Sequence, residues 1–183
     1  MVIKSKCIIF FLAFVVMAAS AQTMGGEITR KSSSKLKGIE RNIDGVIIGL
    51  STKEDVTRLL KTRKISYDLH EPANNYNVIV ANGKFKYQGV EWQAVMYKLY
   101  ENKVFVIVYI KGVDKDKINS LILTSASLNK AYSNKYKKYQ MTTKPGIYQY
   151  QDPYTFITIE LGEHYDELSL GIGDVEISKS LNN

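Results

Sequence analysis

The chain has 183 residues, with 25 Lys or Arg against 18 Asp or Glu, which gives a formal net charge of +7. This length is typical of one domain, or of two small repeats that share a core. The single cysteine, Cys7, lies in a segment that we expect to be removed. The remaining chain then has no thiol, which excludes thiol nucleophiles, thiolate zinc sites and iron–sulfur clusters.

The N-terminus has the pattern of a cleavable export signal. Lys4 and Lys6 precede an uncharged apolar run at 8–18, and the small residues Ala19-Ser20-Ala21 follow it. The run is too short to cross a bilayer core of roughly 30 Å as a helix, which disfavours the alternative of an uncleaved anchor. No cysteine follows the run, which argues against lipid attachment. We therefore expect a signal peptide at 1–21 and a periplasmic or secreted protein.

Charge is distributed unevenly along the rest of the chain. Residues 22–144 carry 22 basic and 11 acidic residues, whereas residues 145–183 carry one basic residue against seven acidic ones. The basic part, residues 22–144, is suited to binding an acidic glycan or glycolipid of the envelope. Alternatively, the acidic strands near the C-terminus pair with lysine-rich neighbours, which would explain the uneven charge without a partner. Export argues against a nucleic-acid partner.

The first elements of the domain are a short strand and a capped helix. Residues 22–41 are rich in Gly, Ser and Lys and are expected to form a flexible leader. A strand is expected at 46–48 and a helix at 51–63, where Ser51 and Glu54 have the spacing of a capping box.

A meander of strands should follow, with a tight hairpin turn at Asn82-Gly83 and another around Asn102. The run at 104–110 is continuously apolar, as in a central strand that is covered on both faces. The strands are expected at 65–69, 78–81, 84–90, 91–100 and 104–110.

The second half has a similar order. A longer helix is expected at 115–134, and strands are expected at 147–151, 154–161 and 168–172, with frayed residues from about Ser178. The sequence thus predicts an α+β domain at 42–178, with two main helices packed on one face of an antiparallel sheet. Its halves, 42–111 and 112–178, are candidates for a tandem helix-plus-meander repeat.

One segment resembles a known family. Ile48-Gly49-Leu50-Ser51-x-x-Glu54-Asp55-Val56-x-x-Leu59-Leu60 is similar to the start of the first helix in envelope proteins of the SmpA/OmlA type. The repeated layout resembles β-lactamase-inhibitor-protein-like domains. The resemblance implies an α+β fold that binds other proteins rather than catalysing a reaction. The chain departs from the SmpA/OmlA pattern in two ways: it has no lipid-accepting cysteine and no Leu-Gly-x-Pro after the helix.

The sequence gives little support for catalysis or for a metal or other cofactor. His70 and His164 each lie beside acidic residues, but both fall where strand ends or turns are expected, and no third ligand is suggested. The segment Gly171-Ile172-Gly173-Asp174 lacks the further glycines and carboxylates of a phosphate or calcium loop. A small hydrolase with paired carboxylates remains the least favoured hypothesis.

Tyrosine is unusually frequent, with 13 residues. Tyrosine and tryptophan offer large amphipathic contact areas, although both also favour half-buried strand positions. We expect a non-catalytic module that binds an envelope or extracellular protein, with inhibition of that protein as one mode of action. The alternative is a glycan- or small-ligand-binding protein that uses a sheet face. The candidate binding residues are Trp92, Tyr97, Tyr136, Tyr139, Tyr148, Tyr150 and Tyr154.

Overall fold

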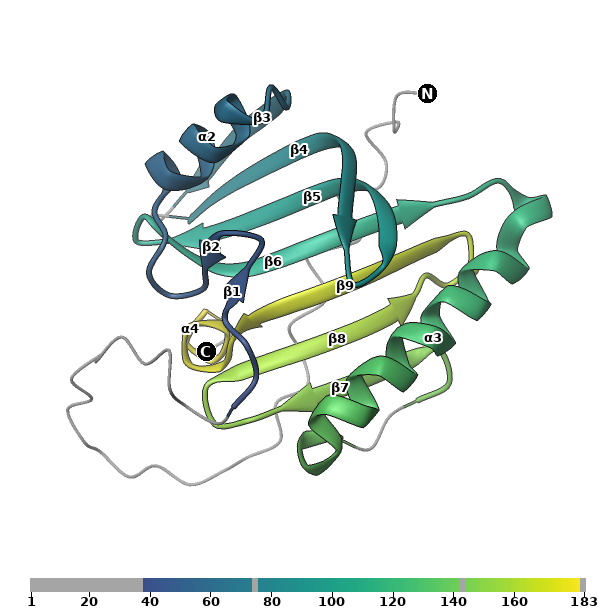
Figure 1. Ribbon diagram of the computed structural model, residues 1–183. Helices are drawn as coiled ribbons and strands as arrows, with labels where there is room; N and C mark the ends of the chain where they lie inside the picture. The colour runs from purple at the N-terminus through teal and green to yellow at the C-terminus, as the bar shows by residue number, and fades with distance from the viewer. Residues whose placement is uncertain (1–37, 74–75, 142–143, 182–183) are drawn as a thin grey trace.

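The structure, a computed structural model, describes residues 38–73, 76–141 and 144–181. The predicted export signal and residues 22–37 of the predicted leader lie outside the described residues. The described part combines a seven-stranded antiparallel sheet with one long helical segment and several short helices (Figure 1). The predicted α+β class is confirmed, but the prediction of two main helices is wrong because the first helix has only 10 residues.

The sheet is built from two meanders that meet at its centre. Strand β6 pairs with β9, so the last strand of each half lies beside that of the other, and the order is β3-β4-β5-β6-β9-β8-β7. The apolar run predicted to be central is β6, the fourth strand in this order. The strands are β3 (Tyr67–Ala73), β4 (Tyr76–Tyr87), β5 (Val90–Tyr100), β6 (Lys103–Gly112), β7 (Ile147–Gln151), β8 (Thr155–Leu161) and β9 (Glu167–Asp174).

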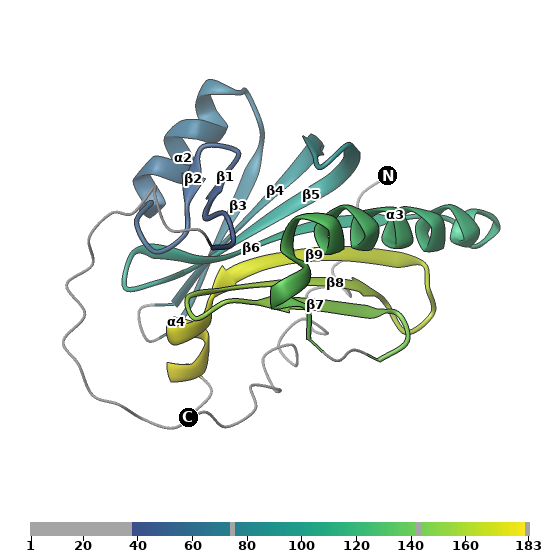
Figure 2. The ribbon, with the colours of Figure 1, turned by 60° about the horizontal axis from the view of Figure 1, so that its bottom comes forward.

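The helices divide unequally between the two faces of this sheet. Helix α2 (Lys53–Thr62), helix α3 (Ile118–Tyr136) and a small hairpin of β1 (Asn42–Ile43) and β2 (Val46–Ile47) lie over one face, which we call the covered face (Figure 2). The 3₁₀ turns η2 (Lys115–Lys117) and η3 (Lys137–Tyr139) flank α3. Among the described elements only α4 (Val175–Ser180) lies against the opposite, second face.

Each face has its own apolar cluster because successive strand residues point to opposite sides. The covered face joins both halves of the chain in one core, in which Val56 and Leu60 of α2 and Leu121 and Leu128 of α3 pack on the sheet. The smaller cluster on the second face consists of Met96, Phe105, Val106, Val108 and Ile177, with Tyr76, Val78, Val80, Tyr100, Ile110 and Phe156 packed against it.

Both ends of the domain reach further than the sequence predicted. Residues 38–41 belong to the fold rather than to a flexible leader, since Ile39 is buried and its N–H donates to Asp152 at 2.6 Å. At the other end, the expected fraying from Ser178 is wrong. Asp174 caps α4 by accepting from the Ile177 N–H, and Ser178 is buried.

The predicted hairpin turn at Asn82-Gly83 is also wrong. Both residues lie inside β4, where the pairing with β5 shifts register between Asn82 and Phe85. The chain instead reverses at Gln88-Gly89, where both residues have positive φ angles of 53° and 74°. A bulge therefore occupies the position that we interpreted as a turn.

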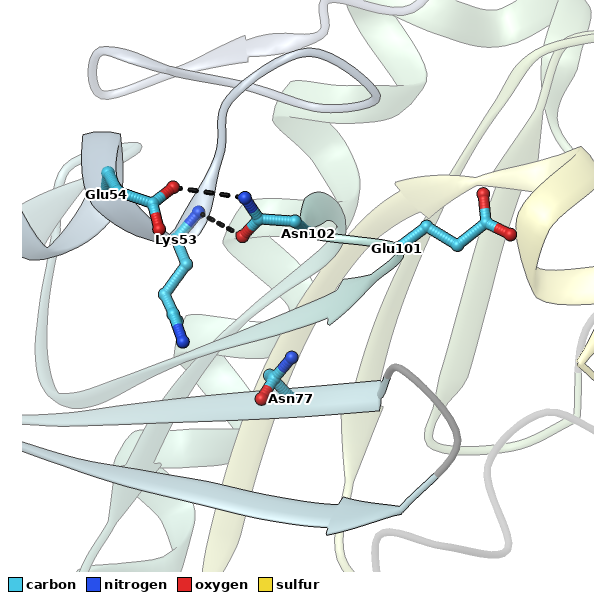
Figure 3. Close-up of a pocket in the computed structure, with 5 residues that line it drawn as sticks. All are labelled: Lys53, Glu54, Asn77, Glu101 and Asn102. Carbon is cyan, nitrogen blue, oxygen red and sulfur yellow. Dashed lines mark hydrogen bonds between the residues drawn. The ribbon is translucent and has the colours of Figure 1, made fainter.

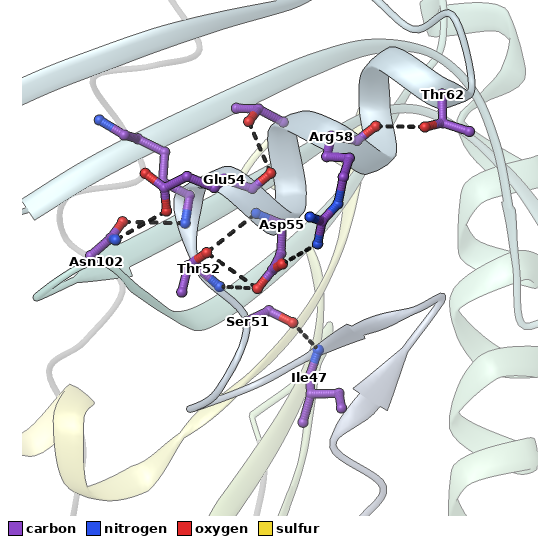
Figure 4. Close-up of polar contacts among 10 residues, drawn as sticks. Ile47, Ser51, Thr52, Glu54, Asp55, Arg58, Thr62 and Asn102 are labelled. Carbon is purple, nitrogen blue, oxygen red and sulfur yellow. Dashed lines mark hydrogen bonds and ion pairs between the residues drawn. The ribbon is translucent and has the colours of Figure 1, made fainter.

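Helix α2 forms as expected, but its cap lies one residue later than the prediction (Figure 4). Thr52 accepts from the Asp55 N–H, and the Asp55 carboxylate accepts from the Thr52 N–H at 3.0 Å. Ser51 instead forms hydrogen bonds with two strands. Its Oγ accepts from the Ile47 N–H of β2, and its carbonyl accepts from the Val104 N–H of β6. The sequence is compatible with a capping box at Ser51 and Glu54 or at Thr52 and Asp55. The second one forms because Ser51 is held by contacts with the strands.

Candidate functional site

The structure places most of the aromatic residues that we predicted for binding inside the core. Trp92, Tyr97, Tyr136 and Tyr150 are buried on the covered face, with at most 6% of each residue exposed. Tyr139 and Tyr148 are partly buried against the same core, and only Tyr154, at 41%, is largely exposed. Trp92, Tyr97 and Tyr150 are therefore not available on a sheet face for a glycan or small ligand, and we assign no binding role to the four buried rings.

Trp92 and Tyr150 bond their polar groups to backbone carbonyls inside the fold. The Trp92 Nε1–H donates to the Tyr87 carbonyl at 3.1 Å, and the Tyr150 hydroxyl donates to the Asn129 carbonyl at 3.0 Å. Burial raises the pKa of Tyr97 to about 12, so its hydroxyl stays protonated at physiological pH. The four buried rings therefore act as core residues with a polar end.

Metal-binding and acid–base groups do not converge in the described ranges. They contain no group of three or more His, Cys, Asp or Glu side chains that could hold a metal ion. His70 and His164 are exposed, as expected from the sequence. Burial and the nearby Glu167 raise the pKa of Glu160 to about 7, but neither of the two hollows described below includes Glu160.

A polar hollow of about 460 Å³ lies where the start of α2 meets the β5–β6 turn (Figure 3). Two of its lining residues, Glu101 and Asn102, form that turn. Figure 3 shows Asn102 between the turn and the helix, while Glu101 extends away from them toward α4. The full lining is Lys53, Glu54, Asn77, Glu101 and Asn102.

Hydrogen bonds fix this turn to the helix. The Asn102 Oδ1 accepts from the Lys53 N–H at 3.3 Å, and its Nδ2 donates to the Glu54 carboxylate at 3.1 Å. The backbone N–H of Glu54 and the Asn102 amide lower the pKa of the Glu54 carboxyl, which therefore stays ionised. The Lys53 ammonium pairs with Glu71 of β3 at 3.1 Å. The hollow is thus preorganised by contacts among three separate elements.

A second hollow, of about 230 Å³, lies on the α4 side of the same turn. Glu101 lines both hollows, and it adopts the left-handed conformation with φ at 48°, as Asn102 does with φ at 60°. Glycine and asparagine are the residues that favour this conformation in a two-residue hairpin, so Glu101 is an unfavourable choice for the turn. The lining of the second hollow is Tyr100, Glu101, Lys103, Glu176, Ile177 and Ser180.

Sequence reasoning predicted a turn around Asn102 but did not identify this site. The available signal was a glutamate in a turn position that normally takes Asn or Gly. The α4 side of the site was not predicted because the chain was expected to fray there. No helix within the described ranges is long and apolar enough to cross a membrane.

Comparison with protein-family models, with curated proteins and with solved structures found no match. The resemblance to SmpA/OmlA-type and β-lactamase-inhibitor-protein-like domains therefore stays a prediction.

Proposed function

We propose that this chain is an exported, non-catalytic binding module whose partner is an envelope or extracellular protein. The observation that carries the proposal is Glu101, a charged residue held in an unfavourable backbone conformation on the rim between two hollows. Residues held in such conformations concentrate at functional sites, where the local cost is offset by a role in recognition.

The chemistry of the site supports a protein partner. Lysine and glutamate side chains alternate around the turn, with Lys53 and Glu54 on one side and Lys103 and Glu176 on the other. A mixed-charge surface of this kind is complementary to the polar rim of a protein interface. Ile177 adds an apolar side chain to the lining of the second hollow.

The test compares two matched glycine substitutions in the exported protein. Glu101→Gly and Gln88→Gly each relieve a positive φ, at 48° and 53°, and the two sites lie in the turns at opposite ends of β5. In both variants the free energy of unfolding should rise by about 0.5–1 kcal/mol. The midpoint of denaturant unfolding should therefore move to a slightly higher concentration. Immobilised proteins are then used to capture partners from the envelope fraction of the native organism.

We expect the unchanged protein and Gln88→Gly to retain one salt-resistant partner protein that Glu101→Gly loses. Equal retention by both variants would show that the β5–β6 turn is not the contact. Retention of no protein by the unchanged chain would refute the proposed function itself.

A second candidate function is glycan binding at the larger hollow, between α2 and the β5–β6 turn. The amides of Asn77 and Asn102 and the carboxylate of Glu101 are groups that bond well to sugar hydroxyls. Calorimetric titration with soluble envelope glycans separates this function from protein binding. A heat of binding that persists at moderate salt in the unchanged protein, and that disappears in Asn77→Ala, would favour a neutral sugar ligand.

A further inference from the structure

Helix α3 has an outer face that points away from the sheet. Its inner face is buried and consists of Leu121, Ser125, Leu128, Tyr132 and Tyr136. Because an α-helix has 3.6 residues per turn, the positions that point the opposite way are Asn119, Leu123, Lys130, Asn134 and Lys137. All five of these residues are exposed, and Figure 2 shows α3 with no other described element on its far side. The outer face extends for about 20 Å along the helix.

The first half of the outer face carries exposed apolar side chains. Leu123 is 72% exposed, the highest value among the large apolar residues of the described ranges. Ile122, beside it, is 41% exposed, and Ala126 one turn later is exposed as well. Isolated apolar residues on a surface are common, but two large neighbours on one side of a helix form a patch that water solvates poorly. This part of α3 is therefore apolar on both its inner and its outer side.

The second half of the outer face carries lysines. The segment 117–151 contains six lysines and no Asp or Glu. Lys130 lies two turns beyond the apolar pair, and Lys137 and Lys138 follow at the end of the helix. All three are exposed, and none of them forms an ion pair with a residue of the described ranges. A positive surface thus adjoins an apolar one on the same helix.

Neighbouring charges do not neutralise this end of α3. Glu40 pairs with Lys135 on the flank of the helix at 3.1 Å, and Asp174 of the acidic C-terminal part pairs with Arg41. The negative end of the helix dipole amounts to only about half a charge, which cannot offset three ammonium groups. The outer face therefore remains positive.

We propose that the outer face of α3 binds the surface of a membrane that contains anionic phospholipids. The lysines pair with headgroup phosphates, while Ile122 and Leu123 enter the boundary between headgroups and acyl chains. The helix lies in the plane of the membrane surface and does not cross it. The apolar pair favours lipid over an acidic glycan, because a glycan would use the lysines but would give the exposed leucine no apolar surroundings.

The first test measures binding of the exported chain to lipid vesicles by sedimentation. The vesicles are phosphatidylcholine alone, or phosphatidylcholine with about one third of anionic phosphatidylglycerol. We expect binding to the anionic vesicles only, and weaker binding as salt rises. Lys137→Gln with Lys138→Gln should weaken this binding about 25-fold, because each lysine near an anionic surface contributes about fivefold in affinity.

Lys61→Gln with Lys64→Gln is the matched control. These two lysines also lie exposed at the end of a helix, α2, and form no ion pair within the described ranges. The control loses the same two charges and keeps the basic residues of 22–37, so the two variants differ only in where the charge is removed. At about 0.1 M salt, charges more than about 10 Å from the membrane are screened, so the control should weaken binding less than about threefold.

The second test follows the apolar pair by fluorescence. Leu123→Trp places an indole at the centre of the outer face, while the native Trp92 is fully buried and gives a constant background. Anionic vesicles should shift the emission of the new tryptophan to shorter wavelength, because its ring leaves water for the membrane boundary. Leu69→Trp, at an exposed position of the edge strand β3, is the control and should keep its emission.

The proposal is overturned by an unchanged protein that does not bind anionic vesicles, by equal losses in the two lysine variants, or by a Leu123→Trp spectrum that stays constant. A soluble acidic polysaccharide provides the last comparison. If it binds through Lys137 and Lys138 while vesicles do not bind, the outer face holds a glycan and the lipid assignment is wrong. Glu101→Gly should bind vesicles as the unchanged protein does, so this proposal and the proposed function fail independently.

Discussion

At the scale of single residues, Glu160 makes the stability of the fold depend on pH. Its folded pKa is about 7, raised from 4.5 by burial first and by Glu167 second. The folded chain therefore keeps a proton that the unfolded chain has lost, and stability falls as pH rises from about 4.5 to about 7. The residues paired with Glu160 on the adjacent strands are Ile147 of β7 and Ser169 of β9, and neither brings a compensating positive charge.

Glu160→Gln should remove this dependence. We expect the variant to be more stable than the unchanged protein by about 1 kcal/mol above pH 7, a value reduced for solvent screening, and nearly equal to it below pH 4.5. Urea unfolding at pH 4.5 and pH 8 measures both differences. Glu163→Gln, at an exposed turn position, is the control and should show no such difference. A constant difference at both pH values would contradict the assignment.

The tyrosines show what could not be predicted from the sequence at this scale. The alternation of β5 correctly indicated a strand, but it did not say which of its two faces would meet the helices. Tyr97 is buried because α2 and the β1–β2 hairpin lie over its side of the sheet, and that placement depends on contacts distant in sequence. Aromatic residues in strands suit a core and an interface equally well, so composition alone could not separate the two.

At the scale of elements, the segment from residue 38 to residue 49 is tied down by Asp152 in the β7–β8 turn. One carboxylate oxygen of Asp152 accepts from the Ile39 N–H, and the other accepts from the N–H groups of Tyr154 and Thr155. Asp152 exposes only 5% of its surface, so removing it leaves buried donors without acceptors.

Asp152→Ala and Asp152→Asn should separate the two roles of this carboxylate. The alanine variant loses all three bonds and should be destabilised by about 3 kcal/mol in chemical unfolding. The asparagine variant can keep the bonds to the turn but directs an NH₂ group at the Ile39 N–H, and it should lose about half as much. Its segment 38–41 should also become sensitive to protease. Equal losses in both variants would place the whole contribution in the bond to Ile39, whereas an unaffected asparagine variant would place it in the turn.

Helices α2 and α3 and most strands could be predicted because local patterns agree with their final environment. The helix that we expected at 115–134 corresponds to η2 at Lys115–Lys117 followed by α3 at Ile118–Tyr136. The errors fall where tertiary contacts override local chemistry. Asn82-Gly83 would form a turn in isolation, but β5 pairs alongside it on both sides of the bulge. Likewise, the cap of α2 moves from Ser51 to Thr52 because Ser51 bonds to β2 and β6.

At the scale of the whole molecule, the two halves are joined by more than the β6–β9 pairing. Tyr132 of α3 lies near Tyr150 of β7, and it also belongs to the same core cluster as Trp92 and Tyr109 from the first half. The helix-plus-meander order predicted for each half is present, yet the core is shared between them. A shared core of this kind should make the halves unfold together.

Ile172→Ala tests whether the halves are one cooperative unit. Ile172 lies on β9 in the second half and exposes 1% of its surface, so the cavity should lower the free energy of unfolding by about 2–4 kcal/mol. The single tryptophan, Trp92, reports from the first half through fluorescence, and circular dichroism reports the helices, most of which lie in the second half. We expect both signals to shift by the same denaturant concentration in the variant. If fluorescence kept its original midpoint while the dichroism midpoint fell, the two halves would be independent folding units. The β6–β9 seam would then be a contact between domains rather than the centre of one.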